Sequence, residues 1–283
     1  KLGIRGILPE FKGHANEESV SWRVVETEEG EYDFSRIDAN IERITRHGLK
    51  TIVPVRSLDT RPPGWAEERF GKESRLWKFG KDGGHQPTMG VNLLDPETRA
   101  SFAAYLEALC THLAENHRPH LGAIALEVSA MSLPRNIDYS PAARTHFQRW
   151  LRDSYGDIAA LNDRWEADYE SFSHVDIPAP RGDAPHLRGP NNPDGAYLSE
   201  GAKWHDWIQW RKAWVAEYFR IQAEIVRRHL PGVPIQAYAI SANSHHAHSE
   251  RPVASWPTER MGGIVDFPSS AATSEPIHAL MRA

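Results

Sequence analysis

Glu127 is the residue of this chain whose position most strongly indicates chemistry. It directly follows the apolar run of residues 121–126 (LGAIAL), which is typical of a buried strand, and small and polar residues come after it. Catalytic groups of parallel α/β barrels lie at the C-terminal tips of the strands, and a carboxyl group there can donate or accept a proton. The alternative is an ordinary acid at a strand end, bonded to a neighbouring arginine or lysine.

A polar stretch after a later apolar run is the second candidate for chemistry. Residues 233–239 (VPIQAYA) predict a strand, and Asn243 and His245 open the histidine-rich sequence of residues 243–250 (NSHHAHSE) that follows it. Imidazole and carboxylate groups bind metals, but this spacing fits no common zinc pattern, and loop histidines also bind substrate hydroxyls or water. We therefore predict no metal site and expect Asn243 and His245 to contact substrate.

The composition is that of a globular protein. The chain has 283 residues, of which 40% are hydrophobic and 25% are charged, and its net charge is −5. No apolar stretch approaches the roughly 20 residues that cross a bilayer, and no signal peptide is visible at residues 1–5. Lysine and arginine are scattered, which argues against a nucleic-acid partner. We expect no membrane partner and favour the cytoplasm.

Short β-rich runs alternate with amphipathic helical segments, which is the pattern of a parallel sheet. The strand-like runs are residues 3–8, 51–55, 121–126, 233–239 and 263–267, with a weak run near 89–93. A closed barrel needs eight strands, whereas these are six. The sequence therefore predicts a (β/α)8 TIM barrel, incomplete at the C-terminus. Residues 1–283 are expected to form one domain with a long loop at about 176–200.

Local signals place the helices between these strands. Ser35 is predicted to cap the first helix, and the dipeptides Asp95-Pro96 and Ser140-Pro141 each set a cap residue before a proline that can begin a helix. Further helices are expected over residues 158–165 and 203–229. Cys110, the only cysteine, falls on the apolar face of a helical pattern, so we expect a buried structural thiol.

Three motifs resemble those of one known family in order and spacing. They are residues 22–38 (WRVVETEEGEYDFSRID), residues 62–65 (PPGW) and residues 147–165 (FQRWLRDSYG followed by LNDRW). They resemble the family-42 glycoside hydrolases, the bacterial β-galactosidases of clan A, over most of residues 20–270. Thr27 stands where that family has proline. Within the first motif, Glu26 and Glu29 are expected to be loop acids that fix the turn at Gly30.

The resemblance implies a barrel that hydrolyses a β-glycoside or oligosaccharide with retention, using two glutamates about 5–5.5 Å apart and no cofactor. Glu127 takes the position of the acid/base at the tip of the fourth strand. Glu275 is the candidate nucleophile within the chain, but no apolar run precedes it, which favours a nucleophile beyond Ala283, or none, over Glu275. Trp65 and Tyr169 are candidates for sugar contacts, and a homo-oligomer is compatible with the sequence.

Departures from the family pattern keep other functions open. Leu126 stands where the family has an asparagine that orients the 2-hydroxyl group of the sugar, and Glu170 replaces a tryptophan. Residues 86–90 (QPTMG) fill the place of paired arginines. These changes favour, as the alternative, a catalytically weak or inert barrel that binds carbohydrate. A metal-dependent hydrolase using the histidines of residues 243–250 is the third hypothesis.

Overall fold

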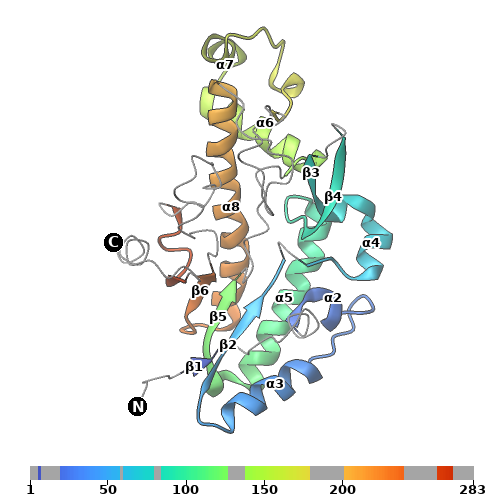
Figure 1. Cartoon of the computed structure of the whole chain (residues 1–283), viewed down its shortest axis with the longest axis vertical. Helices are drawn as coiled ribbons and strands as arrows, with labels where there is room; N and C mark the ends of the chain where they lie inside the picture. Colours follow the sequence, from blue (N-terminus) through green and yellow to red (C-terminus); the bar gives the residue numbers. More distant parts are fainter. Residues whose placement is uncertain are drawn as a thin grey trace, which may run out of the picture.

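The structure is a computed structural model that describes residues 6–7, 20–57, 60–79, 84–126, 138–178, 201–238 and 260–269. Five of its strands form one parallel sheet, in the order β1 (Gly6–Ile7), β2 (Lys50–Val55), β5 (Leu121–Leu126), β6 (Ile235–Tyr238) and β7 (Phe267–Ser269). All neighbours pair in parallel, and their order in the sheet follows the chain (Figure 1). This arrangement is the wall of a TIM barrel, as the sequence predicted.

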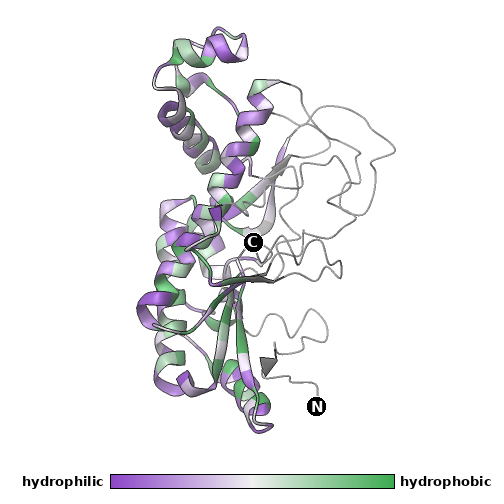
Figure 2. Ribbon diagram, turned by 90° about the vertical axis from the view of Figure 1, so that its left-hand side faces the viewer, coloured by the Kyte–Doolittle hydropathy of each residue, from purple (hydrophilic) through white to green (hydrophobic). Residues whose placement is uncertain are grey.

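Helices cover one side of this sheet. The longer helices are α3 (Ser35–Thr45), α5 (Pro96–Asn116), α6 (Pro141–Tyr155) and α8 (Ala202–His229), and the shorter ones are α2 (Trp22–Val25), α4 (Gly64–Phe70) and α7 (Ile158–Trp165). Figure 2 shows α5 and α8 on the same side of the sheet, where they pack against each other. Val53, Ile124 and Leu126 on the central strands are at most 1% exposed, so the sheet is buried as parallel sheets require.

Tryptophans of α8 form a large part of the core. Trp207, Trp210 and Trp214 are fully buried, and Trp204 is 5% exposed. They recur at three- and four-residue steps, which places their rings along the inward side of one helix. These four tryptophans are therefore structural residues of the core. Within the described ranges, no helix combines the length and apolarity needed to cross a membrane.

Two predicted helix starts are confirmed at the level of atoms. The Asp95 carboxylate accepts a hydrogen bond of 2.8 Å from the Thr98 N–H, and Ser140 Oγ accepts one of 3.1 Å from the Ala143 N–H. Each cap is followed by a proline as the first helical residue, where its missing N–H costs nothing. These starts were readable from sequence because cap and proline are neighbours in the chain.

The predicted cap of α3 is wrong by one residue. Ser35 is already the first helical residue, Phe34 precedes it, and neither side chain caps the helix. Instead, the Ser35 N–H donates to Asp33 Oδ1 at 2.9 Å, so the aspartate two residues earlier shapes the turn into the helix.

The weak third strand near residues 89–93 does not belong to the parallel sheet. Its residues 89–91 are the end of β4 (His85–Val91), which pairs antiparallel with β3 (Arg75–Phe79) in a separate two-stranded sheet. A barrel strand is buried on both faces and needs a nearly continuous apolar run, whereas β4 reads HQPTMGV. The strand before Glu127 is therefore the third of the described parallel strands.

The last strand starts later than the sequence predicted. The prediction was residues 263–267, but β7 begins at Phe267. Gly263 has φ of +77°, and the N–H groups of Ile264 and Val265 both donate to the Met261 carbonyl oxygen. These residues therefore turn, and only Phe267 belongs to both the predicted and the observed strand.

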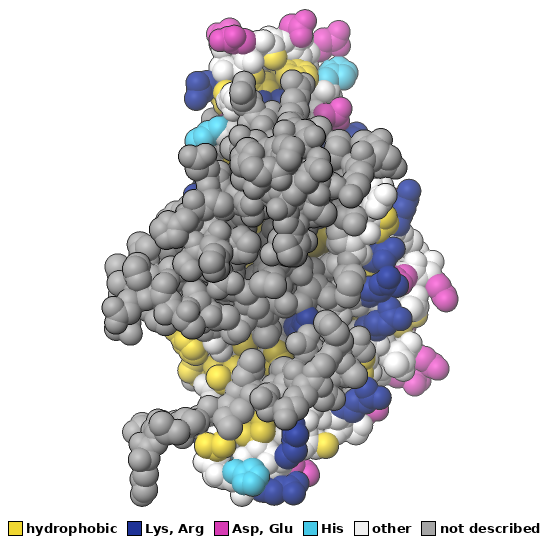
Figure 3. All heavy atoms as spheres, viewed as in Figure 1, with side chains coloured by type: hydrophobic (Ala, Val, Ile, Leu, Met, Phe, Trp, Pro, Cys, Tyr) yellow, Lys and Arg dark blue, Asp and Glu magenta, His cyan; other side chains and the backbone are white. Residues whose placement is uncertain are grey.

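The described surface carries both signs of charge. On the face in Figure 3, lysine and arginine side chains gather along the right-hand edge, and acidic side chains stand beside them. This mixture creates no broad surface of a single charge on that edge.

Candidate active site

The C-terminal edge of the parallel sheet is the place where the sequence predicted chemistry. Leu126, the last residue of β5, pairs with Val55 of β2 on one side and with Ala237 of β6 on the other. Its side chain is fully buried and apolar. The described part of β5 therefore ends between two neighbouring strand tips.

Four predicted site residues lie outside the described residues: Glu127, Asn243, His245 and Glu275. Most of the predicted loop at 176–200 also lies outside them, since the described residues stop at 178 and resume at 201. The described part of the site consists of the strand tips and the residues that precede or follow these segments in the chain.

Asp138 anchors the chain where it re-enters the described fold after residue 137. One carboxylate oxygen accepts hydrogen bonds from the Trp77 N–H and the Ser140 N–H, both at 2.9 Å. The other accepts a hydrogen bond of 2.8 Å from the Ser140 hydroxyl. Leu126 is held by the sheet and Asp138 by this network, so the described residues on either side of residues 127–137 both have several hydrogen-bond partners in the fold.

Burial dominates the electrostatics of Asp138. The side chain is fully buried, and this raises the pKa of its carboxyl to about 6, although the hydrogen bonds from Trp77 and Ser140 lower it. The anchor therefore changes charge near neutral pH, unlike an exposed aspartate.

Asn92 extends the anchor to the antiparallel hairpin. Its amide nitrogen donates to the Glu73 carbonyl oxygen at 3.0 Å and to Ser140 Oγ at 3.2 Å. The preceding residue, Val91, donates its N–H to the Ser57 carbonyl oxygen at 2.7 Å, just beyond the tip of β2. The tip of β2, the hairpin and the start of α6 are thus joined by one network of buried polar groups.

An aromatic cluster lies beside this anchor. The Tyr139 ring stacks on His85 with centroids 5.2 Å apart and contacts Trp207 of α8 at 5.9 Å. The buried guanidinium of Arg211 lies 4.6 Å from the centre of the Trp207 ring, a cation–π geometry. Burial raises the pKa of Tyr139, and the charge of Arg211 opposes that rise. Tyr139, Trp207 and Arg211 are at most 4% exposed, so these three residues of the cluster are buried.

Trp65 is held by the N-terminal motif. Its indole N–H donates to the Glu26 carbonyl oxygen at 3.2 Å, and its ring meets Trp22 edge to face at 5.8 Å. The polar atom of the indole is therefore already used, and a sugar contact would have to use the ring. That contact stays a prediction.

Tyr169 lies between α7 and α8 in the sequence, whereas Trp65 lies in α4. Figure 1 shows α4 well away from α7. The backbone N–H and carbonyl of Tyr169 both bond to the Asn162 side chain, and its hydroxyl accepts a hydrogen bond of 2.9 Å from Lys203. The structure does not bring Trp65 and Tyr169 together. A sugar contact by Tyr169 also stays a prediction.

The W-x-x-x-E-x-x-x-G motif is structural in its described contacts. The Glu26 carboxylate accepts from the Trp22 indole at 2.5 Å and from the Gly30 N–H at 2.7 Å, and Gly30 has φ of +79°. Burial raises the pKa of Glu26, although these hydrogen bonds lower it. The prediction that Glu26 fixes the Glu-Gly turn is confirmed.

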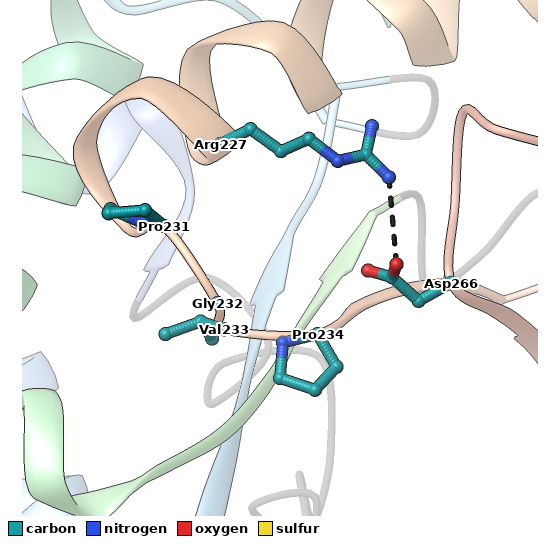
Figure 4. Close-up of a pocket in the computed structure, with 6 residues that line it drawn as sticks. All are labelled: Arg227, Pro231, Gly232, Val233, Pro234 and Asp266. Atoms are coloured by element: carbon teal, nitrogen blue, oxygen red, sulfur yellow. Dashed lines mark ion pairs between the residues drawn. The ribbon is translucent and has the colours of Figure 1, made fainter.

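A cavity of about 440 Å³ lies at the opposite end of the sheet (Figure 4). Residues 231–234, which directly precede β6, line it together with Arg227 of α8 and Asp266, which directly precedes β7. Arg227 forms an ion pair of 3.7 Å with Asp266 across it. Asp266 also accepts a hydrogen bond of 2.7 Å from the Ile235 N–H, which ties it to the start of the strand. The N-terminal ends of barrel strands serve stability, so this cavity is not the candidate active site.

Sequence analysis missed two groups of polar residues. Asp138 could have been found from the sequence Asp-x-Ser-Pro, because an acid two residues before a serine cap can bond to it. The second group is Asp38, His112 and His117, whose potential ligand atoms all lie within 4.8 Å of one another. Asp38 lies far in the sequence from the two histidines.

The sheet and its tips define the class of the protein: an α/β barrel in which a glutamate directly follows a strand of the wall. The sequence model of glycoside hydrolase family 42, described as β-galactosidase, matches residues 15–266. The match covers most of the chain. The chain belongs to glycoside hydrolase family 42, as its motifs predicted.

Relatives of known name are similar over part of their length. β-Galactosidase BbgII of Bifidobacterium bifidum is 27% identical over 221 residues, which are 76% of this chain and 30% of that protein. A β-galactosidase of Thermus thermophilus is 26% identical over 229 residues, which are 75% of this chain and 31% of that protein. The chain thus spans about 30% of the length of these relatives.

Solved structures share the fold. A β-galactosidase from the haloarchaeon Halorubrum lacusprofundi has a TM-score of 0.67 and 18% identity, covering 94% of this chain and 39% of that one. The catalytic domain of a β-amylase from Paenibacillus polymyxa has a TM-score of 0.66 and 14% identity, covering 94% and 75%. The barrel wall is therefore common to hydrolases of more than one name.

Proposed function

We propose that the protein is a glycoside hydrolase that cleaves a β-linked galactoside by a retaining mechanism, with Glu127 as general acid/base. The proposal is supported by membership of family 42 and by named relatives that are β-galactosidases. The observation that carries it is the pairing of Leu126 between two strand tips. Glu127 is the next residue in the sequence, and barrel enzymes hold their catalytic groups at such tips.

In the proposed reaction, Glu127 first acts as an acid. It gives its proton to the glycosidic oxygen while a second carboxylate attacks the anomeric carbon, and it then removes a proton from the water that releases the sugar. Glu275 is the proposed second carboxylate, with a carboxylate outside the sequence as the alternative. Trp65, Tyr169, Asn243 and His245 are proposed to contact the sugar.

The anchor at Asp138 supports this role for Glu127. A general acid works only when it is held close to the oxygen that it protonates. The segment that begins with Glu127 ends at Asp138, whose three hydrogen bonds fix it to β3 and α6. We infer that this network holds Asp138, the described residue that follows the segment, in one position.

A carbohydrate-binding barrel without turnover is the second candidate. The observation in its favour is Leu126, which is apolar and fully buried and cannot donate a hydrogen bond to the 2-hydroxyl of a sugar. Such hydrogen bonds strengthen in the transition state of glycoside hydrolysis. Their loss would lower the rate more than the affinity.

Hydrolysis of a panel of aryl β-glycosides by the intact protein separates these functions. We expect turnover of the galactoside, and a loss of at least about 100-fold in kcat for Glu127→Gln. Glu115→Gln, an exposed glutamate of α5, is the matched control and should keep the full rate. An unchanged rate for Glu127→Gln would refute the role of Glu127. Sugar binding by the unsubstituted protein without turnover would establish the binding barrel instead.

A further inference from the structure

Three potential metal ligands meet on the outer helices of the barrel. Asp38 Oδ1 lies 2.6 Å from His112 Nε2 and 2.7 Å from His117 Nε2. Among the described residues, no other three His, Cys, Asp or Glu side chains have ligand atoms that all lie within 4.8 Å of one another. The cluster combines two imidazole nitrogens with a carboxylate oxygen, a donor set that suits zinc and related ions.

Two elements bring these side chains together. Asp38 stands in the first turn of α3, and His112 stands in the last turns of α5. His117 follows as the C-terminal cap of α5, where its backbone has left the helical conformation (φ −131°, ψ 3°). This turn lets a residue five positions after His112 point its Nε2 at the same oxygen.

The face of the His112 ring packs against an aromatic side chain. It stacks on the Phe34 ring with centroids 4.4 Å apart and an interplanar angle of 22°. The side chains of His117, His112 and Asp38 are 11%, 20% and 34% exposed. The ligands are therefore ordered, and a solvated ion has access to them.

The cluster lies away from the proposed active site. The end of α5 leads through a short 3-10 helix, η3 (Arg118–His120), into the first residue of β5, whereas Glu127 follows the last residue of that strand. An ion here would contribute to stability and not to bond cleavage.

We propose that Asp38, His112 and His117 bind a divalent transition-metal ion of the Zn²⁺ type, with water as a fourth ligand. Metal–ligand bonds of about 2.0–2.1 Å place neighbouring tetrahedral ligands about 3.3 Å apart. The two nitrogen–oxygen contacts must then open by roughly 0.6 Å, which small side-chain rotations supply. Both Nε2 atoms already point at the same carboxylate oxygen, Asp38 Oδ1.

Metal binding would displace protons from the histidines and would change the contacts of a neighbouring side chain. Each Nε2 that now carries a proton to Asp38 must present its lone pair to the ion, so that proton goes to Nδ1 or to solvent. The exposed Asn116 amide, whose nitrogen is 3.3 Å from His112 Nδ1, would rotate to present its oxygen. The ion would join α3 to the end of α5 in the folded state only, so it should raise Tm.

Zinc titration of the full chain, freed of metal by dialysis against a chelator, tests the proposal. Calorimetry should count one more zinc per chain for the unsubstituted protein than for His112→Ala or His117→Ala, and only the former should gain Tm with zinc. His120→Ala, an exposed neighbour outside the cluster, is the matched control and should bind as the unsubstituted chain does. The difference between variants is decisive, because the histidines of residues 243–250 can add binding of their own.

Asp38→Asn keeps the test valid if the alanine variants fail to fold. It retains an oxygen that accepts from both histidines but removes the negative charge, and we expect zinc affinity to fall by more than about tenfold. Tetrahedral Co²⁺ bound to the unsubstituted chain should show its visible absorption bands, and these should weaken in Asp38→Asn. Equal zinc stoichiometry and equal affinity in all variants would overturn the proposal and leave a hydrogen-bonded clamp.

Discussion

Replacing Asp138 by alanine should be among the most damaging single changes outside the apolar core. The substitution leaves the Trp77 N–H and the Ser140 N–H without their acceptor in a buried place, and the Ser140 hydroxyl loses its partner as well. A buried donor without a partner costs about 1–3 kcal/mol, and the hydroxyl can rotate to limit its own loss. We expect a loss of about 3–5 kcal/mol near pH 4.

The size of this loss should depend on pH. Burial raises the pKa of Asp138 in the folded protein to about 6 from a usual value of 3.8. The folded state therefore holds this proton more tightly than the unfolded state, so the contribution of Asp138 to stability falls as pH rises from about 4 to 6 and is then constant. The alanine variant lacks this titration. The gap between the two proteins should narrow by about 2 kcal/mol between pH 4 and pH 8.

Guanidinium unfolding followed by tryptophan fluorescence measures both effects. Asp157→Ala is the matched control, because Asp157 makes one exposed cap bond of 2.8 Å to the Ala160 N–H, and it should cost about 1 kcal/mol. A loss for Asp138→Ala no larger than that of the control would refute the buried network. A gap that widens above pH 6 would show that the folded state favours the ionised carboxylate, which is the opposite of the effect expected from burial.

Two further predictions test the packing around the barrel. Burial raises the pKa of the Cys110 thiol to about 12, so a thiol reagent at pH 8 should leave the folded protein unmodified and label it after denaturation; labelling of the folded state would show that α5 does not bury this residue. Tyr218→Phe removes a buried hydrogen bond of 2.7 Å to the Val91 carbonyl oxygen and should cost about 1–2 kcal/mol in equilibrium unfolding, whereas an unchanged stability would contradict the contact between α8 and β4.

Features encoded by neighbouring residues could be predicted from the sequence. The caps at Asp95 and Ser140 depend on residues three positions apart, and the apolar run before Glu127 needs only its own period to be recognised. The prediction of Ser35 as a cap was wrong for a local reason as well, because the Asp33 carboxylate accepts the hydrogen bond from the Ser35 N–H at the start of the helix. Short-range chemistry thus predicted most helices and the central strands.

Pairing over long distances could not be read in the same way. Residues 89–93 were assigned to the parallel sheet because they are extended, but an extended run does not reveal its partner, which for β4 is β3. Asp38 and the two histidines are separated by 74 and 79 residues, and nothing in the sequence around either histidine refers to α3. The fold, and not a motif, creates that cluster.

The role of Glu127 is tested most directly by comparing substrates that differ in the leaving group. A general acid helps a poor leaving group, such as an alcohol, far more than an acidic dinitrophenol, which departs without a proton. For Glu127→Ala we predict that kcat/KM falls by at least about 100-fold on an alkyl β-galactoside and much less on the dinitrophenyl β-galactoside. An equal loss on both substrates, or no loss on either, would contradict the assignment of Glu127 as the general acid.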